Sequence, residues 1–241
     1  MRFDHLFHFV PNLTDAVAQY ESRGFHVTMG GQHPGRGTQN AATRSGPTYI
    51  ELVGVHDWAA FRRQEEERQR RYPNIRFRTE ELLQAGGGAA GFAVEVADIH
   101  EAVRRAQAVG LPMANPVTGR ILRPDGSQAE WGMAGLTEGP YWLPFFIQYA
   151  VPPARRAQPE TWRLHHLRIE SVDPESTAQL LGRLLDLPVE GEVVPLPGCA
   201  IRLGRGTDER IDSVVFEQPA DPTGDICGLR YLTLTQRQAI R

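Results

Sequence analysis

One pattern of apolar and turn residues occurs three times in this chain of 241 residues. Residues 3–17 show an apolar strand, a turn and the start of a helix, and the same order returns in residues 90–103 and 164–178. A unit of this kind cannot bury its own apolar face, so its copies are expected to pack on one another. The repeat therefore predicts a modular architecture before any single motif is considered.

The order of predicted elements within each complete repeat is βαβββ. The first module spans residues 3–55 and the second spans residues 90–150, with a charged helical insertion over 56–88. A linker rich in proline and arginine is predicted over 151–163, and residues 164–241 are expected to hold a third βαβββ-like module and an incomplete fourth. The predicted fold class is α+β, built from paired βαβββ modules.

Composition restricts the classes of function. The formal charge of −3 provides no basic surface for nucleic acid or for an anionic membrane. No apolar run approaches the ~18 residues of a membrane-spanning helix, and the first residues lack the apolar segment of a signal peptide. The two cysteines, Cys199 and Cys227, have neither metal-ligand spacing nor a disulfide-rich context. We therefore expect a cytoplasmic protein that binds a small molecule, and neither nucleic acid nor a membrane.

Two polar side chains occur where a buried strand normally has apolar ones. His5 lies on the first predicted strand, and Glu51 lies in T-Y-I-E-L-V on the last strand of the first module. A carboxylate in such a strand is costly to bury unless it is paired or bound to a cation. Gln148 has the corresponding place in the second module, and the three side chains together would suit a divalent ion. Alternatively, His5 pairs with Glu51, and Gln148 pairs with the backbone.

Residues 32–40, Q-H-P-G-R-G-T-Q-N, form the second concentration of unusual chemistry. Glycines in this segment would let backbone N–H groups approach a ligand closely. His33 lies within it, and Asn40 is expected to project along the same surface as Glu51. The segment is thus predicted to contact a ligand, although a simple turn between strands has a similar composition.

Each further candidate residue has two possible roles, one in ligand binding and one in structure. Tyr49, Trp131 and Phe146 either line a ligand cavity or fill the core, and Arg123 either binds a carboxylate or lies on the surface. His166 stands at the repeat position of His5, which suggests a second site, but no matching carboxylate is evident there. These residues extend the predicted site without defining it.

Four motifs together resemble the glyoxalase-like group of the vicinal oxygen chelate superfamily. They are the D-H-L opening, the H-P-G-x-G-T-x-N loop, the Y-I-E-L strand, and the R-P-D-G turn followed by P-F-F-I-Q. The resemblance is strong over residues 3–150 and weak beyond them. It implies paired modules of the glyoxalase/bleomycin-resistance/dihydroxybiphenyl dioxygenase type, which curl around a cavity and share one site.

The resemblance also implies an activity. In metal-using members of the superfamily, the first and last strands of each module bind a divalent ion that polarises substrate oxygens. Carried over to this chain, the ligands are His5, Glu51 and Gln148, whereas Gly91 offers no side chain at the fourth position. The expected protein is a lyase, isomerase or ring-cleaving enzyme that uses Mn, Fe, Ni or Zn, with Glu51 and His5 as catalytic residues.

Two other functions remain open from the sequence. The resemblance includes metal-independent proteins of the bleomycin-resistance type, and here such a protein would sequester a hydrophobic ligand between Tyr49, Trp131 and Phe146. A structural role with a vestigial cavity is the third reading. In each case the last predicted strand, 228–235, would leave an open sheet edge, which predicts a homodimer.

Overall fold

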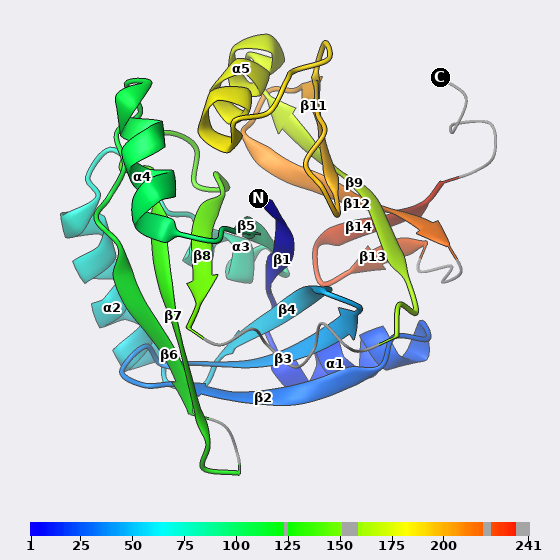
Figure 1. Ribbon diagram of the computed structural model, residues 1–241. Coiled ribbons are helices and arrows are strands. Elements are labelled where there is room, and N and C mark those ends of the chain that lie inside the picture. The colour runs from blue at the N-terminus through cyan, green and yellow to red at the C-terminus, as the bar shows by residue number, and fades with distance from the viewer. Residues whose placement is uncertain (123–124, 151–158, 219–222, 235–241) are drawn as a thin grey trace.

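The structure is a computed structural model that describes residues 1–122, 125–150, 159–218 and 223–234. Its N-terminal part is a closed barrel of eight strands, and its C-terminal part is an open sheet of six strands packed beside the barrel (Figure 1). Helices and strands alternate in the βαβββ order in the first two modules. The α+β fold of paired modules predicted from the sequence is confirmed.

The barrel is made of two modules with the same element order. The first consists of β1 (Arg2–Phe9), α1 (Leu13–Ser22), β2 (Val27–His33), β3 (Thr38–Ser45) and β4 (Thr48–Val55). The second consists of β5 (Gly88–Glu95), α4 (Ile99–Ala108), β6 (Val117–Leu122), β7 (Gln128–Gly135) and β8 (Phe145–Tyr149). Between them lie α2 (Trp58–Arg71) and α3 (Thr79–Gln84).

Strand pairing joins the two modules through their first strands. β1 pairs in parallel with β4 of its own module and antiparallel with β5, and β5 pairs in parallel with β8. Closure through β2 and β6 gives the order β1-β4-β3-β2-β6-β7-β8-β5. Every barrel strand therefore has one inner and one outer face.

The C-terminal sheet repeats this pairing in shortened form. It contains β9 (Arg163–Ser171), α5 (Pro174–Leu185), β10 (Val193–Val194), β11 (Ala200–Arg205), β12 (Arg210–Gln218), β13 (Gly224–Ile226) and β14 (Leu229–Thr233). β9 pairs in parallel with β11 and antiparallel with β12, which in turn pairs in parallel with β14. By analogy with β1 and β5, the fourth module begins at β12 and not at residues 228–235.

This pairing also removes the argument for a dimer. The sheet order is β10-β11-β9-β12-β14-β13, so β14 lies between two strands and is not an edge. The edge strands β10 and β13 have two and three residues, and such short edges offer little backbone for pairing with another chain. The homodimer stays a prediction without the structural feature on which it depended.

The repeated turn residue starts a helix in each copy. The side chain of Asn12 accepts hydrogen bonds from Thr14 and Asp15 N–H at the start of α1. Asp98 and Asp173 do the same for α4 and α5. Asn and Asp satisfy the unpaired N–H groups of a first helical turn, which is the physical reason that the pattern repeats.

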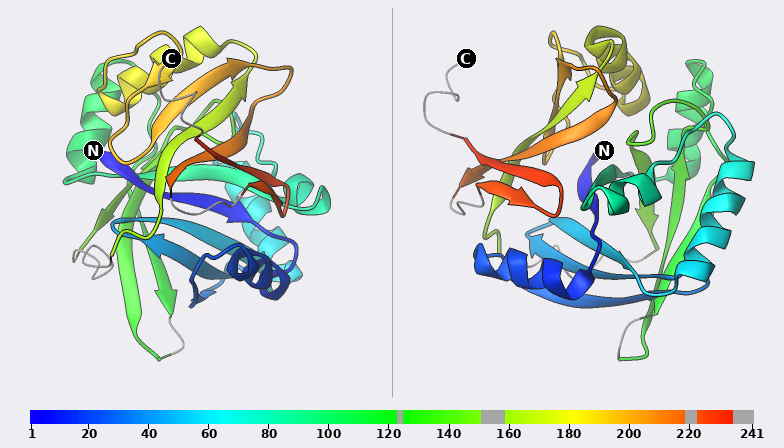
Figure 2. Two further views of the ribbon diagram at one scale, coloured as in Figure 1. Left: turned by 90° about the vertical axis from the view of Figure 1, so that its right-hand side faces the viewer. Right: turned by 180° about the vertical axis from the view of Figure 1, so that it is seen from behind.

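The hydrophobic core lies between the barrel and the C-terminal sheet. Outer-face side chains of the barrel, including Leu6, Ile50 and Phe92, belong to one buried cluster with the helices and with residues of β9 to β14. α4 and α5 lie side by side above it (Figure 2), where Arg105 reaches Asp186 and the carbonyl of Leu184. Among the described residues, no helix is both long and apolar enough to span a membrane.

Candidate functional site

The inner face of the barrel carries the polar residues that the sequence singled out. In the β1–β4 pair, His5 lies opposite Tyr49 and Phe7 lies opposite Glu51. Residues opposite each other share a face, and alternate residues along a strand share it too. The neighbours Leu6 and Ile50 belong to the core outside the barrel, so His5 and Glu51 are both on the inner face.

Solvent reaches this inner face. Phe7, Phe145, Trp131 and Tyr149 are only partly buried, although the barrel is closed. Phe146, which faces the core, is 1% exposed. An inner face that is partly exposed to solvent and lined by aromatic and polar side chains is suited to binding a small molecule.

A β-bulge brings Asp4 and His5 together. Against β5, Phe3 pairs with Val94 and His5 pairs with Ala93, which leaves Asp4 as the extra residue. Bulges re-aim side chains, and here Oδ2 of Asp4 lies 2.7 Å from Nδ1 of His5. Both residues are buried, at 0% and 2% exposure.

Asp4 is itself held by further polar groups. The hydroxyl of Tyr149, on β8, donates to its Oδ2 at 2.7 Å. Arg2 lies 3.6 Å from its Oδ1 and also pairs with Glu95 at 2.6 Å. These partners hold the carboxylate in place, and the carboxylate in turn fixes the orientation of the His5 ring.

Glu51 lies between two imidazoles and an amide. Asn40 donates from Nδ2 to its Oε1 at 2.5 Å. His5 Nε2 lies 3.4 Å from Oε2, and His33 Nε2 lies 3.7 Å from Oε1. We call Asp4, His5, His33, Asn40 and Glu51 the barrel cluster.

Glycines on β2 allow Asn40 to reach Glu51. The N–H of Gly31 donates to Oδ1 of Asn40 at 2.9 Å, which turns the amide nitrogen toward the carboxylate. A Cβ atom on Gly30 would lie 1.9 Å from the same oxygen, so a side chain is excluded there. His33, at the end of β2, is held through Nδ1 by the hydroxyl of Thr38 at 2.9 Å.

The two histidines of the cluster have different surroundings. Burial lowers the pKa of His33, and the charge of Glu51 opposes this effect, so His33 is neutral near pH 7. His5 Nδ1 faces the carboxylate of Asp4. An ionised carboxylate accepts hydrogen bonds and cannot donate one. His5 Nε2 is buried and finds no hydrogen-bond partner in the described part of the chain, because its approach to Glu51 lacks hydrogen-bond geometry.

The cluster does not have the donor set of a resident metal ion. In the described part of the second module, Gly91 has no side chain, and the inner-face residues of β8 are Phe145, Ile147 and Tyr149, none of which is a His, Cys, Asp or Glu. The imidazoles of His5 and His33 approach different oxygens of Glu51. Among the described residues, no group of three or more His, Cys, Asp or Glu side chains is arranged to hold a metal.

Gln148 and Phe146 face away from the cluster. Tyr149 reaches Asp4 inside the barrel, so Gln148 and Phe146 are on the outer face of β8. Gln148 accepts from Ile99 N–H at 3.0 Å and donates to the carbonyl of Ala97 at 2.9 Å, at the start of α4. The structure therefore corrects the expected positions of both residues, since Gln148 does not reach the ion site and Phe146 lies in the core.

The other predicted residues divide into three groups. Tyr49 stacks on His5 with ring centroids 4.3 Å apart. Trp131 lies opposite Tyr149 in the β7–β8 pair and so shares the inner face. Arg123 lies outside the described residues.

Sequence reasoning missed several inner-face residues. Asp4 precedes a histidine that was singled out, but only the bulge brings their side chains together. Phe145 and Tyr149 are found by alternation along β8, once the register is known. Arg44 lies opposite Tyr49 in the β3–β4 pair, with its Cζ 4.4 Å from the ring centroid.

The C-terminal sheet carries a changed copy of the cluster. His165 is the extra residue of a bulge in β9, as Asp4 is in β1, and Nδ1 of His165 lies 2.6 Å from Nδ1 of His166. His166 lies opposite Ala200, so Arg202 takes the place of Glu51. Burial lowers the pKa of His166 to about 4, helped by His165 and Arg202. This copy has no carboxylate at the position of Glu51.

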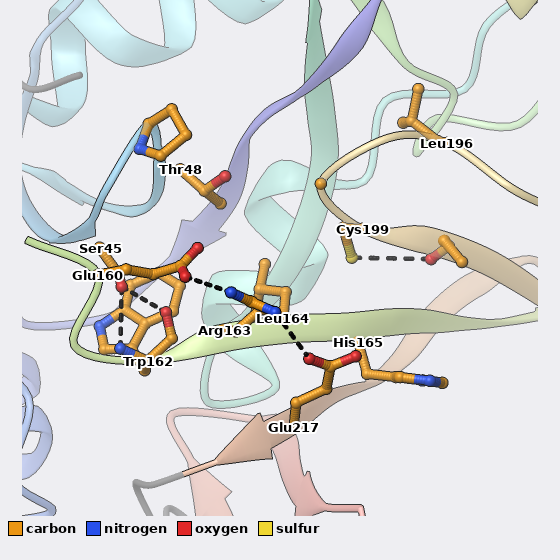
Figure 3. Close-up of a pocket in the computed structure, with 13 residues that line it drawn as sticks. Ser45, Thr48, Glu160, Trp162, Arg163, Leu164, His165, Leu196, Cys199 and Glu217 are labelled. Atoms are coloured by element: carbon orange, nitrogen blue, oxygen red, sulfur yellow. Dashed lines mark hydrogen bonds and ion pairs between the residues drawn. The ribbon is translucent and has the colours of Figure 1, made fainter. Parts of the chain in front are cut away.

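A cavity of about 350 Å³ lies between the two parts of the molecule, away from the barrel cluster (Figure 3). The β3–β4 turn, the start of β9 and residues 196–200 line it. Arg163 lies within it between Glu160 at 2.5 Å and Glu217 at 3.6 Å. Its one lining arginine is thus already paired with carboxylates.

Comparisons with known proteins identify the family and the fold. Residues 3–185 match the family described as glyoxalase-like domain. A hypothetical protein from Staphylococcus aureus has a TM-score of 0.81 at 16% identity, covering 96% of this chain and 99% of that chain. A mutant of 4-hydroxymandelate synthase from Streptomyces coelicolor has a TM-score of 0.50 at 14% identity, and the match covers 90% of this chain and 71% of that chain. Methylmalonyl-CoA epimerase from Mycobacterium tuberculosis has a TM-score of 0.45 at 16% identity, covering 62% and 89%.

No curated protein matches the sequence. The Staphylococcus aureus structure shares the fold over both the barrel and the C-terminal sheet. The family match covers most of the chain and includes β1, β4 and the whole barrel cluster. This protein belongs to the glyoxalase-like domain family and has the fold of the vicinal oxygen chelate superfamily.

Proposed function

We propose that this protein is a small-molecule enzyme of the isomerase or lyase type, in which His5 transfers a proton to and from a substrate inside the barrel. One observation carries the proposal. His5 Nε2 is buried and has no hydrogen-bond partner among the described residues, while Nδ1 of the same ring is held by Asp4 at 2.7 Å. A buried polar atom left unpaired is costly, and a reacting ligand would supply its partner.

Asp4 acts as the positioning residue for His5. Its carboxylate accepts the Nδ1–H of His5, which leaves the lone pair of the imidazole on Nε2. The same division of roles, with a buried carboxylate that orients a histidine base, supports proton transfer in other enzymes. Tyr149 keeps the carboxylate in place through its hydroxyl.

Glu51 supplies the second acid–base group. Its Oε2 lies 3.4 Å from His5 Nε2. When neither atom carries a proton, both are acceptors and repel each other at this distance, so a proton between them is favourable. Asn40 already donates to the other oxygen, so Oε2 is the atom directed at the substrate. A base that removes a proton and a neighbouring group that returns it are together sufficient for an isomerisation.

The metal-dependent form of the function receives less support from the side chains. It would require Mn, Fe, Ni or Zn held by His5, Glu51 and Gln148, and Gln148 bonds to backbone groups outside the barrel. The remaining two donors are fewer than the three protein ligands usual in catalytic zinc sites.

A metal-independent binding protein is the second candidate. The observation that favours it is the aromatic character of the inner face. Phe7, Tyr49 and Phe145 all lie around His5, with ring centroids 4.3 to 6.0 Å from its ring. Such a face would also sequester an apolar compound without reacting with it.

Proton exchange with solvent separates these functions. Small carbonyl compounds with an acidic C–H would be incubated with the protein in D₂O, and loss of the C–H signal would be followed by NMR. Exchange should be reduced roughly 100- to 10,000-fold in His5→Gln. The matched control is His100→Gln, at an exposed position on α4.

Two results would reject the enzyme. One is the absence of exchange with every compound, and the other is equal exchange by His5→Gln and the unaltered protein. The same assay after treatment with a chelator tests the metal form. Loss of exchange that is restored by Mn, Fe, Ni or Zn would show that a metal is needed after all.

A further inference from the structure

We propose that the ligand of the barrel is a small organic carboxylate and that Arg44 binds its carboxylate group. The inference rests on the proposed function in one respect, since it takes the inner face of the barrel as the ligand site. It goes further by naming the chemical class of the ligand and the residue that recognises it.

Arg44 lies on the inner face, close to the reacting groups. It is opposite Tyr49 in the β3–β4 register, two residues along β3 from Ala42, which faces Glu51. Its guanidinium carbon is 4.4 Å from the centroid of the Tyr49 ring, and the His5 ring is 4.3 Å from the same centroid. Tyr49 lies between them in the β1-β4-β3 order, so a ligand that extends past the edge of its ring would contact both Arg44 and His5.

Arg44 also has an unsatisfied donor. Its Nη1 is buried and has no hydrogen-bond partner, and no carboxylate of the described residues lies within ion-pair distance of the side chain. Arg2 and Arg68 are also partly buried but differ in this respect. Arg2 pairs with Glu95, and Arg68 pairs with Glu65. A buried charged N–H without an acceptor is costly, and a carboxylate oxygen of a ligand would remove that cost.

A second arginine adds positive potential beside the cluster. Arg36 lies in the turn after β2 and is partly buried. Burial and the charge of Arg68 lower its pKa, whereas the charge of Glu51 raises it. Arg36 thus interacts electrostatically with Glu51, but it makes no ion pair within the described part of the chain. Two unpaired guanidinium groups around the cluster favour an anion over a neutral ligand.

The carboxylates of the cluster favour a single negative charge on that anion. Asp4 and Glu51 are both buried near His5. Their repulsion of a ligand grows with its charge, so a phosphate dianion is disfavoured relative to a carboxylate. The planar guanidinium also matches the planar carboxylate, which it can bind with two parallel hydrogen bonds.

Binding measurements with matched ligands test the proposal. Propionate, 2-hydroxybutyrate and benzoate would be compared with their uncharged amides and with methyl phosphate, by calorimetry and by thermal shift. The carboxylates should bind, and the amides should not. Arg44→Gln should weaken carboxylate binding by about 10- to 100-fold, because a charged hydrogen bond is lost. Arg183→Gln, at an exposed position on α5, is the matched control and should leave binding unchanged.

Arg44→Lys provides a second variant if Arg44→Gln does not fold, as judged by circular dichroism. Lysine keeps the charge but lacks the planar fork, so weaker binding of carboxylates is expected. The proposal is overturned if the amides bind as well as the carboxylates, if methyl phosphate binds more tightly, or if no carboxylate binds. Unchanged binding in a folded Arg44 variant would overturn it too.

This test separates the two proposals. Carboxylate binding that depends on Arg44, without any proton exchange, would reject the enzyme and keep the ligand class. Proton exchange on an uncharged compound, unaffected by Arg44→Gln, would reject the ligand class and keep the enzyme.

Discussion

The first strand of the barrel and the first strand of the C-terminal sheet contain the same bulge with different side chains. In β1 the bulge joins Asp4 to His5, and in β9 it joins His165 to His166. The neighbouring strand then presents Glu51 in the barrel and Arg202 in the sheet. The backbone irregularity is thus retained in both parts, while among the described strands the combination of Asp, His and a facing Glu is found in the barrel and not in the C-terminal sheet.

This difference suggests that the two copies have separate roles. The closed barrel has an inner face that solvent reaches, whereas the C-terminal sheet packs against the barrel and contributes to the hydrophobic core. His166 lies among positive groups and has a pKa of about 4, lowered mainly by burial. A neutral histidine without a carboxylate partner is suited to packing and not to proton transfer.

The largest expected effect comes from Asp4→Asn. The amide oxygen of asparagine accepts a weaker hydrogen bond from His5 Nδ1 than the carboxylate does, so the ring is no longer held in one orientation. The kcat/KM for proton exchange should therefore fall roughly 100- to 10,000-fold. His165→Asn alters the equivalent bulge in β9 and should leave kcat/KM unchanged. Equal losses in both variants would contradict the assignment of activity to the barrel.

A pH-dependent loss of stability is expected at the joint between the two parts. His8 on β1 bonds to Tyr20 on α1 and to the carbonyl of Cys227, and burial lowers its pKa from 6.5 to about 4. The unfolded chain therefore binds more protons between these values, and stability falls as the pH drops through this window. The free energy of unfolding should be about 2 kcal/mol lower at pH 5 than at pH 7.5 from this group alone.

Urea unfolding at the two pH values measures that loss. His166 has a lowered pKa as well and acts in the same direction. His8→Gln should reduce the difference between the two pH values, because the titrating group is removed. An unchanged difference in this variant would show that His8 does not contribute.

A smaller effect is expected for Tyr231→Phe. The hydroxyl of Tyr231, on β14, hydrogen-bonds to that of Tyr20 and links the C-terminal sheet to the first module. Its loss should lower the free energy of unfolding by about 1 kcal/mol. Tyr72→Phe, at the end of α2, serves as the control and should change stability by less than about 0.5 kcal/mol. Equal effects of the two substitutions would argue against a specific role of the Tyr20–Tyr231 pair.

The smallest effect is expected for Arg202→Glu, which gives β11 the charge that Glu51 has in β4. Arg202 is one of the groups that lower the pKa of His166, after burial and His165. Replacing it with a carboxylate should raise that pKa, and NMR titration of the His166 ring would measure the change. A pKa that does not move would show that burial alone sets it.

The fold was predictable from the sequence to the extent that local chemistry determines it. Asn12, Asp98 and Asp173 start three helices as N-caps, and their repetition is visible in the sequence. Strand alternation placed Tyr49 and Glu51 on one face of β4, whereas the meeting of His5 with Glu51 depends on the register between β1 and β4. The role of both residues stays a proposal.

The prediction for β8 shows where such reasoning stops. Gln148 and Glu51 occupy similar places in their apolar strands, yet the register puts Phe145 opposite Ala93 and turns Gln148 outward. A shift of one residue moves every side chain to the other face. The sequence contains no local signal for that shift, because it depends on how β5, β7 and β8 pair.

By itself, the sequence determined the repeated modules, the helix starts and the presence of an imidazole and a carboxylate on neighbouring strands. Only the tertiary structure decided that Asp4 meets His5 at a bulge, that Arg44 lies against Tyr49, and that the fourth module begins at β12. The physical reason is the range of the forces involved. Caps and turns depend on residues a few positions apart, whereas register and bulges depend on strands that are distant in the chain.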